Sequence, residues 1–187
     1  MKYTITRQFS FTNEKFRIIS DSKTICTVKA TPSKDFQGHF NIKLSNLTQE
    51  YTGEDYCLVE PDCQQSQNYL IYSKNDEKNT KILFGQLHWK LSSYNNYEYT
   101  IIIGQKLYKV RSCDLKDCRL VIVDANHSSN LNPYSTTNYP ELLYQVIDTF
   151  SKANKKFHVI IHEREWSLGY LAITILLDLH ECERSTE

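Results

Sequence analysis

The sequence predicts a mainly β protein: a closed antiparallel barrel of about twelve strands around a buried hydrophobic C-terminal helix, with one extra helix outside. Two observations lead to this fold class. Short segments with alternating apolar residues fill the chain from residue 2 to about 124. A later stretch, from Trp166 to Leu179, is apolar on every side when it is drawn as a helix. Such a helix must be enclosed, and a barrel of more than about eight strands has room to enclose it.

The expected strands are short and are separated by polar turns. Phe40, Ile42 and Leu44 alternate with polar residues, which is typical of a strand with one buried and one solvated face. Turn-forming residues at 20–23 and at Gly104 indicate tight connections between antiparallel neighbours. We expect strands near 2–9, 15–20, 23–29, 38–44, 55–60, 68–73, 81–90, 97–103, 105–110, 117–124 and 157–162.

A change of pattern after residue 124 predicts a helix on the outside of the barrel, at about 139–153. Asn138 is a suitable N-cap, Pro140 suits the first turn, and Glu141 completes a capping box. The apolar residues that follow form a one-sided stripe, which favours a helix lying on a surface. The stripe consists of Leu142, Leu143, Val146, Ile147 and Phe150.

The core helix is predicted at about 166–181. Fourteen residues span about 21 Å, which is shorter than the roughly 20 residues that cross a bilayer. Thr174 and Asp178 also interrupt the apolar run. We therefore expect protein, not lipid, to enclose this helix. Its expected core residues are Trp166, Leu168, Leu171, Ile173, Ile175, Leu176 and Leu177.

Length and composition indicate one domain, residues 1–187, which we expect to be a monomer. The chain has 40% hydrophobic residues, enough for one sizeable core, and no linker-like segment divides it. Lys plus Arg and Asp plus Glu are equal at 22 each, so the overall charge gives no reason to expect a nucleic-acid partner. The first residues do not form a signal peptide, which predicts a cytoplasmic protein with reduced cysteines.

Three stretches resemble segments of the tubby C-terminal-like superfamily, which includes tubby proteins, phospholipid scramblases and LURP-one-related proteins. They are 15–29, Tyr97–Gly104, and Phe157–Ile161 followed by Leu168–Asp178. The resemblance implies a twelve-stranded barrel around a central helix, and through the tubby proteins it implies phosphoinositide binding. The Pro-rich N-terminal region and the cysteine cluster of scramblases are missing, and no headgroup-binding basic pair can be matched residue by residue.

Two groups of basic residues are the candidates for a lipid-headgroup site. Lys106, Lys109 and Arg111 are expected near one another on a strand pair, and Lys152, Lys155 and Lys156 are expected at the end of the outer helix. Cations beside an anionic membrane contribute about 1 kcal/mol each. The competing interpretation of the second group is that its lysines interact with the C-terminal end of that helix.

Other reactive residues do not predict a metal or catalytic site. Cys113 and Cys118 lack zinc-ligand spacing, and on a strand His158 and His162 share one face, which we expect to be solvated. Cys57 and Cys63 are expected in a loop. The chain contains none of the nucleophile-elbow, P-loop, dinucleotide-binding or zinc-protease motifs. We therefore expect no cofactor, no metal and no enzymatic activity.

The sequence thus predicts a non-enzymatic tubby-like module that binds phosphoinositide or other anionic lipid headgroups, or a protein partner, at a membrane surface. One alternative is a lipocalin-like carrier of a small apolar ligand. That alternative is disfavoured because lipocalins have an early tryptophan, whereas Trp89 and Trp166 come late. A second alternative is a scramblase-related membrane protein.

Overall fold

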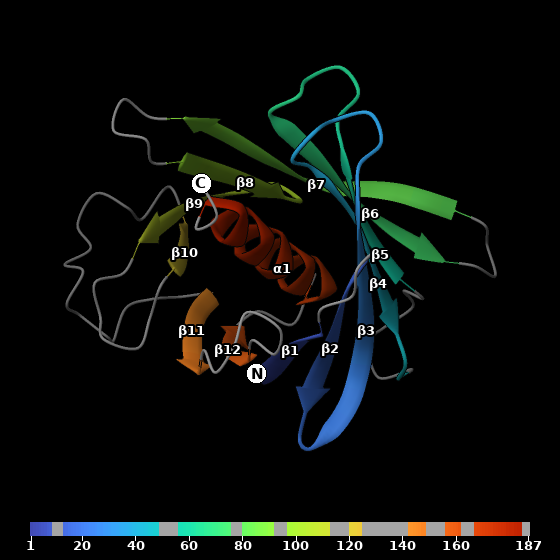
Figure 1. The fold of residues 1–187 in the computed structure, drawn as a ribbon, viewed down its shortest axis with the longest axis vertical. Helices are drawn as coiled ribbons and strands as arrows, with labels where there is room; N and C mark the ends of the chain where they lie inside the picture. Colours follow the sequence, from blue (N-terminus) through green and yellow to red (C-terminus); the bar gives the residue numbers. More distant parts are fainter. Residues whose placement is uncertain are drawn as a thin grey trace.

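The computed structural model describes residues 1–8, 13–48, 56–75, 80–91, 97–112, 120–124, 142–148, 156–161 and 167–184. Within these residues there are twelve strands and one helix (Figure 1). The strands are β1 (Lys2–Gln8), β2 (Glu14–Ser20), β3 (Lys23–Pro32), β4 (Phe40–Asn46), β5 (Tyr56–Pro61), β6 (Asn68–Asn75), β7 (Thr80–Leu91), β8 (Tyr97–Ile103), β9 (Lys106–Ser112), β10 (Leu120–Asp124), β11 (Leu142–Asp148) and β12 (Lys156–Ile161). The helix is α1 (Ser167–Arg184). The prediction of a mainly β fold with a C-terminal helix is confirmed.

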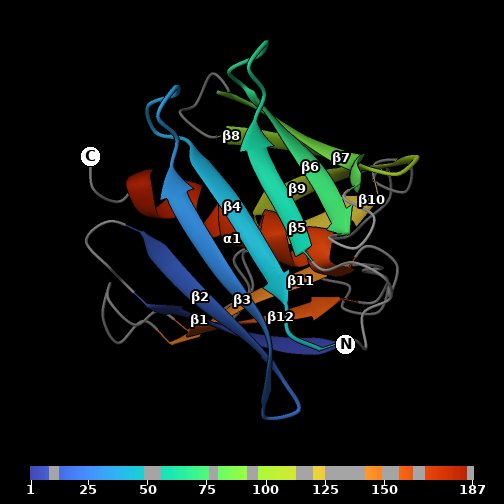
Figure 2. The same cartoon turned by 90° about the vertical axis from the view of Figure 1, so that its right-hand side faces the viewer.

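The strands are joined by antiparallel pairing in the order of the chain. Each strand from β2 to β11 pairs with the strand before it and the strand after it, and β1 pairs with both β2 and β12. The ladder of hydrogen bonds therefore returns to its first strand, which gives a closed barrel. Figure 2 shows β1 to β5 side by side, with α1 behind them. Strands that pair on both sides have no exposed backbone edge to attract another chain.

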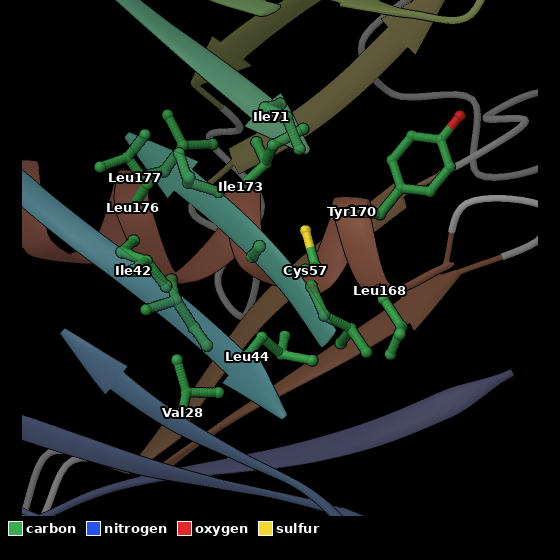
Figure 3. Packing of buried hydrophobic residues seen from close by; sticks show 14 of the residues in the cluster. Val28, Ile42, Leu44, Cys57, Ile71, Leu168, Tyr170, Ile173, Leu176 and Leu177 are labelled. Atoms are coloured by element: carbon green, nitrogen blue, oxygen red, sulfur yellow. The ribbon is translucent and has the colours of Figure 1, made fainter. Parts of the chain in front are cut away.

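The core lies between the inner faces of the strands and α1. Along the strands whose side chains are described, inward and outward residues alternate, and the inward residues of β1 and β12, such as Ile5 and Val159, are completely buried. Every residue of α1 from Ser167 to His180 is also buried. Thr174, the polar residue in the middle of the helix, donates its hydroxyl hydrogen to the carbonyl oxygen of Tyr170 at 2.8 Å. Figure 3 shows helix and strand side chains packed together in this core.

The buried helix confirms the prediction for this segment, with slightly different bounds. The predicted core residues have exposed fractions between 0 and 2%: Leu168, Leu171, Ile173, Ile175, Leu176 and Leu177. Trp166 lies outside the described residues. Within the described residues, no helix is both long and apolar enough to cross a membrane.

The predicted outer helix over about 139–153 is wrong where the structure describes it, because residues 142–148 form strand β11. The backbone of Leu143 lies opposite Val121 of β10, and Tyr144 lies opposite Val159 of β12. A strand at this place satisfies hydrogen-bonding groups on both neighbours, whereas a helix would leave two sheet edges without partners. The tertiary requirement for a strand therefore outweighs the local helical pattern.

Candidate functional site

The outer surface of β2, β3 and β4 carries three lysines in direct cross-strand register. Lys15 lies opposite Lys29, and Lys29 lies opposite Lys43 on the next strand. All three are exposed, because residues beside them in the sequence, such as Phe16 and Val28, point into the barrel. Neighbouring strands are about 4.8 Å apart, so the backbone positions of the three lysines lie within about 10 Å of one another.

A second row beside the lysines adds one more cation. Arg17 is exposed and lies opposite Thr27, which in turn lies opposite Ser45. The one acidic residue in β2, β3 and β4 is Glu14, and its carboxylate accepts a hydrogen bond from the guanidinium of Arg7 at the barrel interior. Four cations therefore share this surface with hydroxyl groups. We call it the cationic face, and it consists of Lys15, Arg17, Lys29 and Lys43.

The arrangement of the lysines is unfavourable for the sheet by itself. Like charges placed directly opposite each other on neighbouring strands destabilise the pairing. Lys43 is partly compensated, because its ammonium nitrogen lies 4.0 Å from the ring centroid of Tyr56, a contact that Lys74 also makes at 5.2 Å. Lys15 and Lys29 have no ion pair with any residue that the structure describes.

The positive surface continues past β2 onto β1 and β12. Arg17 lies opposite Thr6 of β1, and Thr6 lies opposite Lys156 of β12. Lys2, at the start of β1, is exposed on the same outer side as Thr6, because the residues between them alternate inward and outward. Basic residues thus occur on five consecutive strands of the barrel exterior, from β12 to β4.

The first predicted group of cations does not form a cluster of this kind. Lys106, Lys109 and Arg111 all lie on one strand, β9, and not on a strand pair as predicted. Lys109 is exposed and follows the buried Tyr108, so it faces outward. Lys106 has the inward parity of Tyr108 and is exposed because it begins the strand, at the barrel rim. Lys106 and Lys109 therefore occupy different parts of the surface.

The second predicted group is also divided. These lysines were expected at the C-terminal end of the outer helix, but residues 142–148 form a strand. Lys152 and Lys155 lie outside the described residues. Lys156 begins β12, where it is exposed. Two strands, β10 and β11, separate it from β9. Of the six predicted cations, Lys156 is the one that the structure places beside the cationic face.

The cysteines and histidines considered as metal ligands do not gather in the described structure. Cys57 is buried within β5, so its predicted place in a loop is wrong, whereas Cys63 is exposed in the turn after that strand. His158 is half-buried on the outer side of β12, and its Nδ1 atom lies 3.0 Å from the hydroxyl of Thr4. Cys113, Cys118 and His162 lie outside the described residues. Among the residues that are described, no group of three or more His, Cys, Asp and Glu could hold a metal ion.

A histidine is buried where the C-terminal half of α1 meets the strands. The Nε2 atom of His180 lies 3.1 Å from the hydroxyl of Tyr69, and its Nδ1 atom lies 3.4 Å from the hydroxyl of Tyr99. Burial, and then the nearby charge of His39, lower the pKa of His180 to about 4. The imidazole is therefore neutral at physiological pH, and its two tyrosine contacts link the helix to β6 and β8.

A buried ion pair links the same helix to β1. The guanidinium of Arg7 points inward and donates to the carboxylate of Asp178 at 3.5 Å as well as to Glu14. Arg7 also lies over the ring of Phe16, 5.8 Å from its centroid. Because the side chain of Asp178 is 0% exposed, these contacts position α1 and are not available to a ligand.

The cationic face was not predicted from the sequence, although the alternation of lysines with apolar residues indicated that these lysines face the solvent. Lys29 lies between Val28 and Ala30, and Lys43 lies between Ile42 and Leu44. In a strand this alternation directs each lysine to the solvent. What the local pattern does not contain is the register that aligns the lysines of three strands in one row.

Comparison with known proteins adds no assignment. No protein-family model, curated protein or solved structure matches this chain. A fold by itself does not define an activity. Function must therefore be inferred from the charge and geometry of the cationic face.

Proposed function

We propose that the protein is a non-enzymatic, tubby-like module that binds anionic phospholipid membranes, including those with phosphoinositides, through its cationic face. The observation that carries this proposal is the row of Lys15, Lys29 and Lys43 in direct register. Opposed like charges weaken the pairing of strands, and an anionic partner would relieve the repulsion between these lysines. Membrane binding also agrees with what the resemblance to the tubby C-terminal-like superfamily implies.

A membrane suits this surface better than a protein partner does. Protein interfaces are depleted of lysine, and their strongest contacts are aromatic or apolar groups at a desolvated centre. Three of the four cations here are lysines. The second row, beside them, consists of Arg17, Thr27 and Ser45 and contains no apolar residue. A lysine ammonium is a point charge on a flexible stem, so it does not need a partner of fixed geometry. A fluid anionic surface meets that condition.

The expected binding is weak and sensitive to salt. A contribution of about 1 kcal/mol for each of four cations amounts to about 4 kcal/mol, which corresponds to a Kd of about 1 mM. The surface is also convex, because a twelve-stranded ring turns by roughly 30° per strand, so that a flat membrane contacts three or four strands. Raising the ionic strength from about 0.1 M to about 1 M shortens the Debye length from about 10 Å to about 3 Å and should abolish binding.

The carrier alternative is not supported by the interior of the barrel. A carrier needs an internal cavity that is wide enough for its ligand. Here α1 occupies the interior, and Leu171, Ile173 and Ile175 are completely buried against the strands. The described side chains therefore favour a function on the outer surface.

The test is sedimentation of the protein with vesicles of phosphatidylcholine, with and without phosphatidylserine, at low ionic strength. We expect binding to the anionic vesicles alone. The variant Lys15→Gln/Lys29→Gln/Lys43→Gln should bind about 100-fold more weakly, because it loses three contributions of about 1 kcal/mol. Vesicles with a phosphoinositide at matched total charge show whether one headgroup is preferred.

A matched control removes the same number of charges elsewhere. The variant Lys106→Gln/Lys109→Gln/Arg111→Gln changes β9 and should retain the binding of the parent protein. Equal loss in both triple variants would assign the effect to overall charge and would contradict a role of the cationic face. If the parent protein does not sediment with anionic vesicles at low salt, the membrane proposal is wrong, and an acidic protein partner is the next candidate.

A further inference from the structure

A groove lies on the outside of the barrel, beside the cationic face but distinct from it. It runs along β1, between β12 and the turn that joins β2 to β3, and has a volume of about 320 Å³. Thr4, Thr6 and Lys2 of β1 line the groove on one side, together with Lys156 of β12. Asp21 and Ser22 of the turn also line it. Its volume is within the range of sites for small ligands, roughly 300–1,000 Å³.

The register of the strands explains why polar groups converge on this side of the groove. Thr4 lies opposite His158 of β12 and opposite Ile19 of β2, and Thr6 lies opposite Lys156. These residues face outward because Tyr3 and the other odd-numbered residues of β1 are buried in the core. Two hydroxyl groups are thus presented side by side on a rigid strand, and not on a loop.

Two lysines, Lys2 and Lys156, make the middle of the groove electrically positive. Burial, and then the charges of Lys2 and Lys156, lower the pKa of His158, which contacts Thr4 in the groove. Lys156 precedes His158 by two residues on the outer side of β12, and Lys2 lies opposite Ile160, two residues after it, so the two lysines flank His158. Neither lysine has an ion pair with a residue that the structure describes. An anion in the groove would meet two ammonium groups and the hydroxyl donor of Thr6. The hydroxyl of Thr4 is a further donor when Nδ1 of His158 carries the hydrogen of their contact.

The wall of the groove carries the opposite charge in a fixed position. Asp21 and Ser22 have φ angles of 48° and 65°, so both are in the left-handed conformation of a tight two-residue hairpin turn. The carboxylate of Asp21 would repel a second anionic group and would accept hydrogen bonds from a hydroxyl or amine. Because Thr4 lies opposite Ile19 in an antiparallel pair, Asp21 lies toward the Lys2 end of the groove. The groove thus has a centre, between the two lysines, that suits an anion, and one end that suits a donor.

We infer that this groove binds a single phosphate monoester that also carries a hydroxyl or amine group. The phosphate lies between Lys2 and Lys156 and accepts a hydrogen bond from Thr6, and one from Thr4 when His158 donates to the Thr4 oxygen, while the donor group of the ligand faces Asp21. The same chemistry is found in small phosphorylated alcohols and amines and in the headgroups of some lipids. This inference does not depend on membrane binding by the cationic face.

Calorimetric titration of the full chain with glycerol phosphate and with inorganic phosphate tests the inference. We expect glycerol phosphate to bind more tightly, and Lys2→Gln or Lys156→Gln to weaken it about tenfold each. Asp21→Asn, which keeps a residue that tolerates positive φ, should weaken glycerol phosphate and strengthen inorganic phosphate. Lys34→Gln, an exposed lysine in the loop between β3 and β4, is the matched control and should change neither affinity.

Nuclear magnetic resonance of the His158 ring gives a second measurement at the groove itself. A bound dianion offsets the charges of Lys2 and Lys156, so the pKa of His158 should rise when glycerol phosphate is added. If neither heat nor a shift of the His158 ring is observed at millimolar glycerol phosphate, the inference is wrong. An equal response of Asp21→Asn and the parent protein to both ligands would contradict the assigned orientation.

Vesicles distinguish the two sources of the ligand. Phosphatidylinositol 4-phosphate presents a phosphate monoester on a ring with free hydroxyl groups, whereas phosphatidylinositol presents a diester alone. If the groove takes a lipid headgroup, vesicles with phosphatidylinositol 4-phosphate should compete with glycerol phosphate and those with phosphatidylinositol, at matched total charge, should not. If it takes a free ligand, neither should compete. Loss of vesicle binding in the triple variant of the cationic face, with glycerol phosphate binding intact, would separate this site from the proposed membrane surface.

Discussion

His180 shows how one buried residue makes stability depend on pH. Its imidazole contacts Tyr69 and Tyr99 and is 8% exposed, so the protonated form is disfavoured in the folded protein. Its pKa is about 4 when folded and 6.5 for an unperturbed histidine. Between these values the unfolded chain binds a proton that the folded chain does not. Stability from this residue is therefore complete above pH 6.5 and decreases as the pH falls toward 4.

The corresponding prediction concerns the pH dependence of the free energy of unfolding. Between pH 6.5 and pH 4 the parent protein should lose about 3 kcal/mol through His180. His180→Gln can retain a hydrogen bond but cannot titrate, so its stability should fall less over this range. Urea unfolding at several pH values measures both. Identical slopes for the parent protein and His180→Gln would refute the assignment.

The hairpin of β2 and β3 shows what the sequence predicts and where it stops. The two-residue turn pairs Ser20 with Lys23, and an uninterrupted ladder would then place Lys15 opposite Val28. Such a pair would direct a lysine and a valine to the same side of the sheet. The structure resolves this conflict with a one-residue shift between Ile18 and Ile19, which brings Lys15 opposite Lys29. The strands were predictable from alternation, but the row of lysines depended on this shift.

Strand β11 shows the complementary failure of a local pattern. Asn138, Pro140 and Glu141 are good helix-starting residues, and the apolar residues that follow fit a helical stripe as well as a strand. Hydrogen-bond partners on β10 and β12 decide between these structures. That information lies far away in the sequence, so reasoning on a window of residues could not contain it. The core helix was predictable because its apolar residues leave no exposed side, whatever surrounds it.

Packing between α1 and β7 gives a prediction that opposes helix propensity. A Cβ atom at Gly169 would lie 2.6 Å and 2.8 Å from two ring carbons of Phe84. Alanine favours a helix by about 1 kcal/mol over glycine, whereas overpacking a core costs about 1–3 kcal/mol. Gly169→Ala should therefore destabilise the protein by up to about 2 kcal/mol in urea unfolding.

A double variant isolates the cause of that loss. Phe84→Leu removes the ring carbons that would meet the new methyl group, and by itself it leaves space in the core. Gly169→Ala combined with Phe84→Leu should be more stable than Phe84→Leu alone, because the helix preference is then no longer offset. If Gly169→Ala alone raises stability, the close contact with Phe84 does not govern this site.

At the scale of the whole molecule, charge is balanced in number but not in position. The chain has 22 basic and 22 acidic residues, yet β2, β3 and β4 together contain one acid, and it faces the interior. Net charge therefore gave no indication of a basic surface. The candidate site became visible only when the barrel aligned residues 14 positions apart, Lys15 with Lys29 and Lys29 with Lys43.

This arrangement predicts a conflict between stability and binding. Lys29 is opposed by a lysine on each side, so Lys29→Gln should stabilise the fold by about 0.5 kcal/mol at low salt and by less at high salt. The same variant should weaken vesicle binding. Urea unfolding at two salt concentrations measures the first effect. Lys90→Gln is the control, because Lys90 lies 2.9 Å from Glu98 and its loss should bring no gain. A Lys29→Gln variant that is no more stable than the parent protein at low salt would argue against repulsion within the row.

The closure of the barrel by β1 and β12 constrains the moment at which the chain can fold during synthesis. The amino group of Met1 donates a hydrogen bond to the carbonyl oxygen of Ile161, and the two residues are 160 positions apart. The apolar segment that fills the interior, α1, is translated later still. A ribosome therefore releases most of the strands before either their last neighbour or their core exists. Over that interval the nascent chain presents unpaired strand edges and inward-facing apolar residues, so its successful production depends on protection of these surfaces until α1 has emerged.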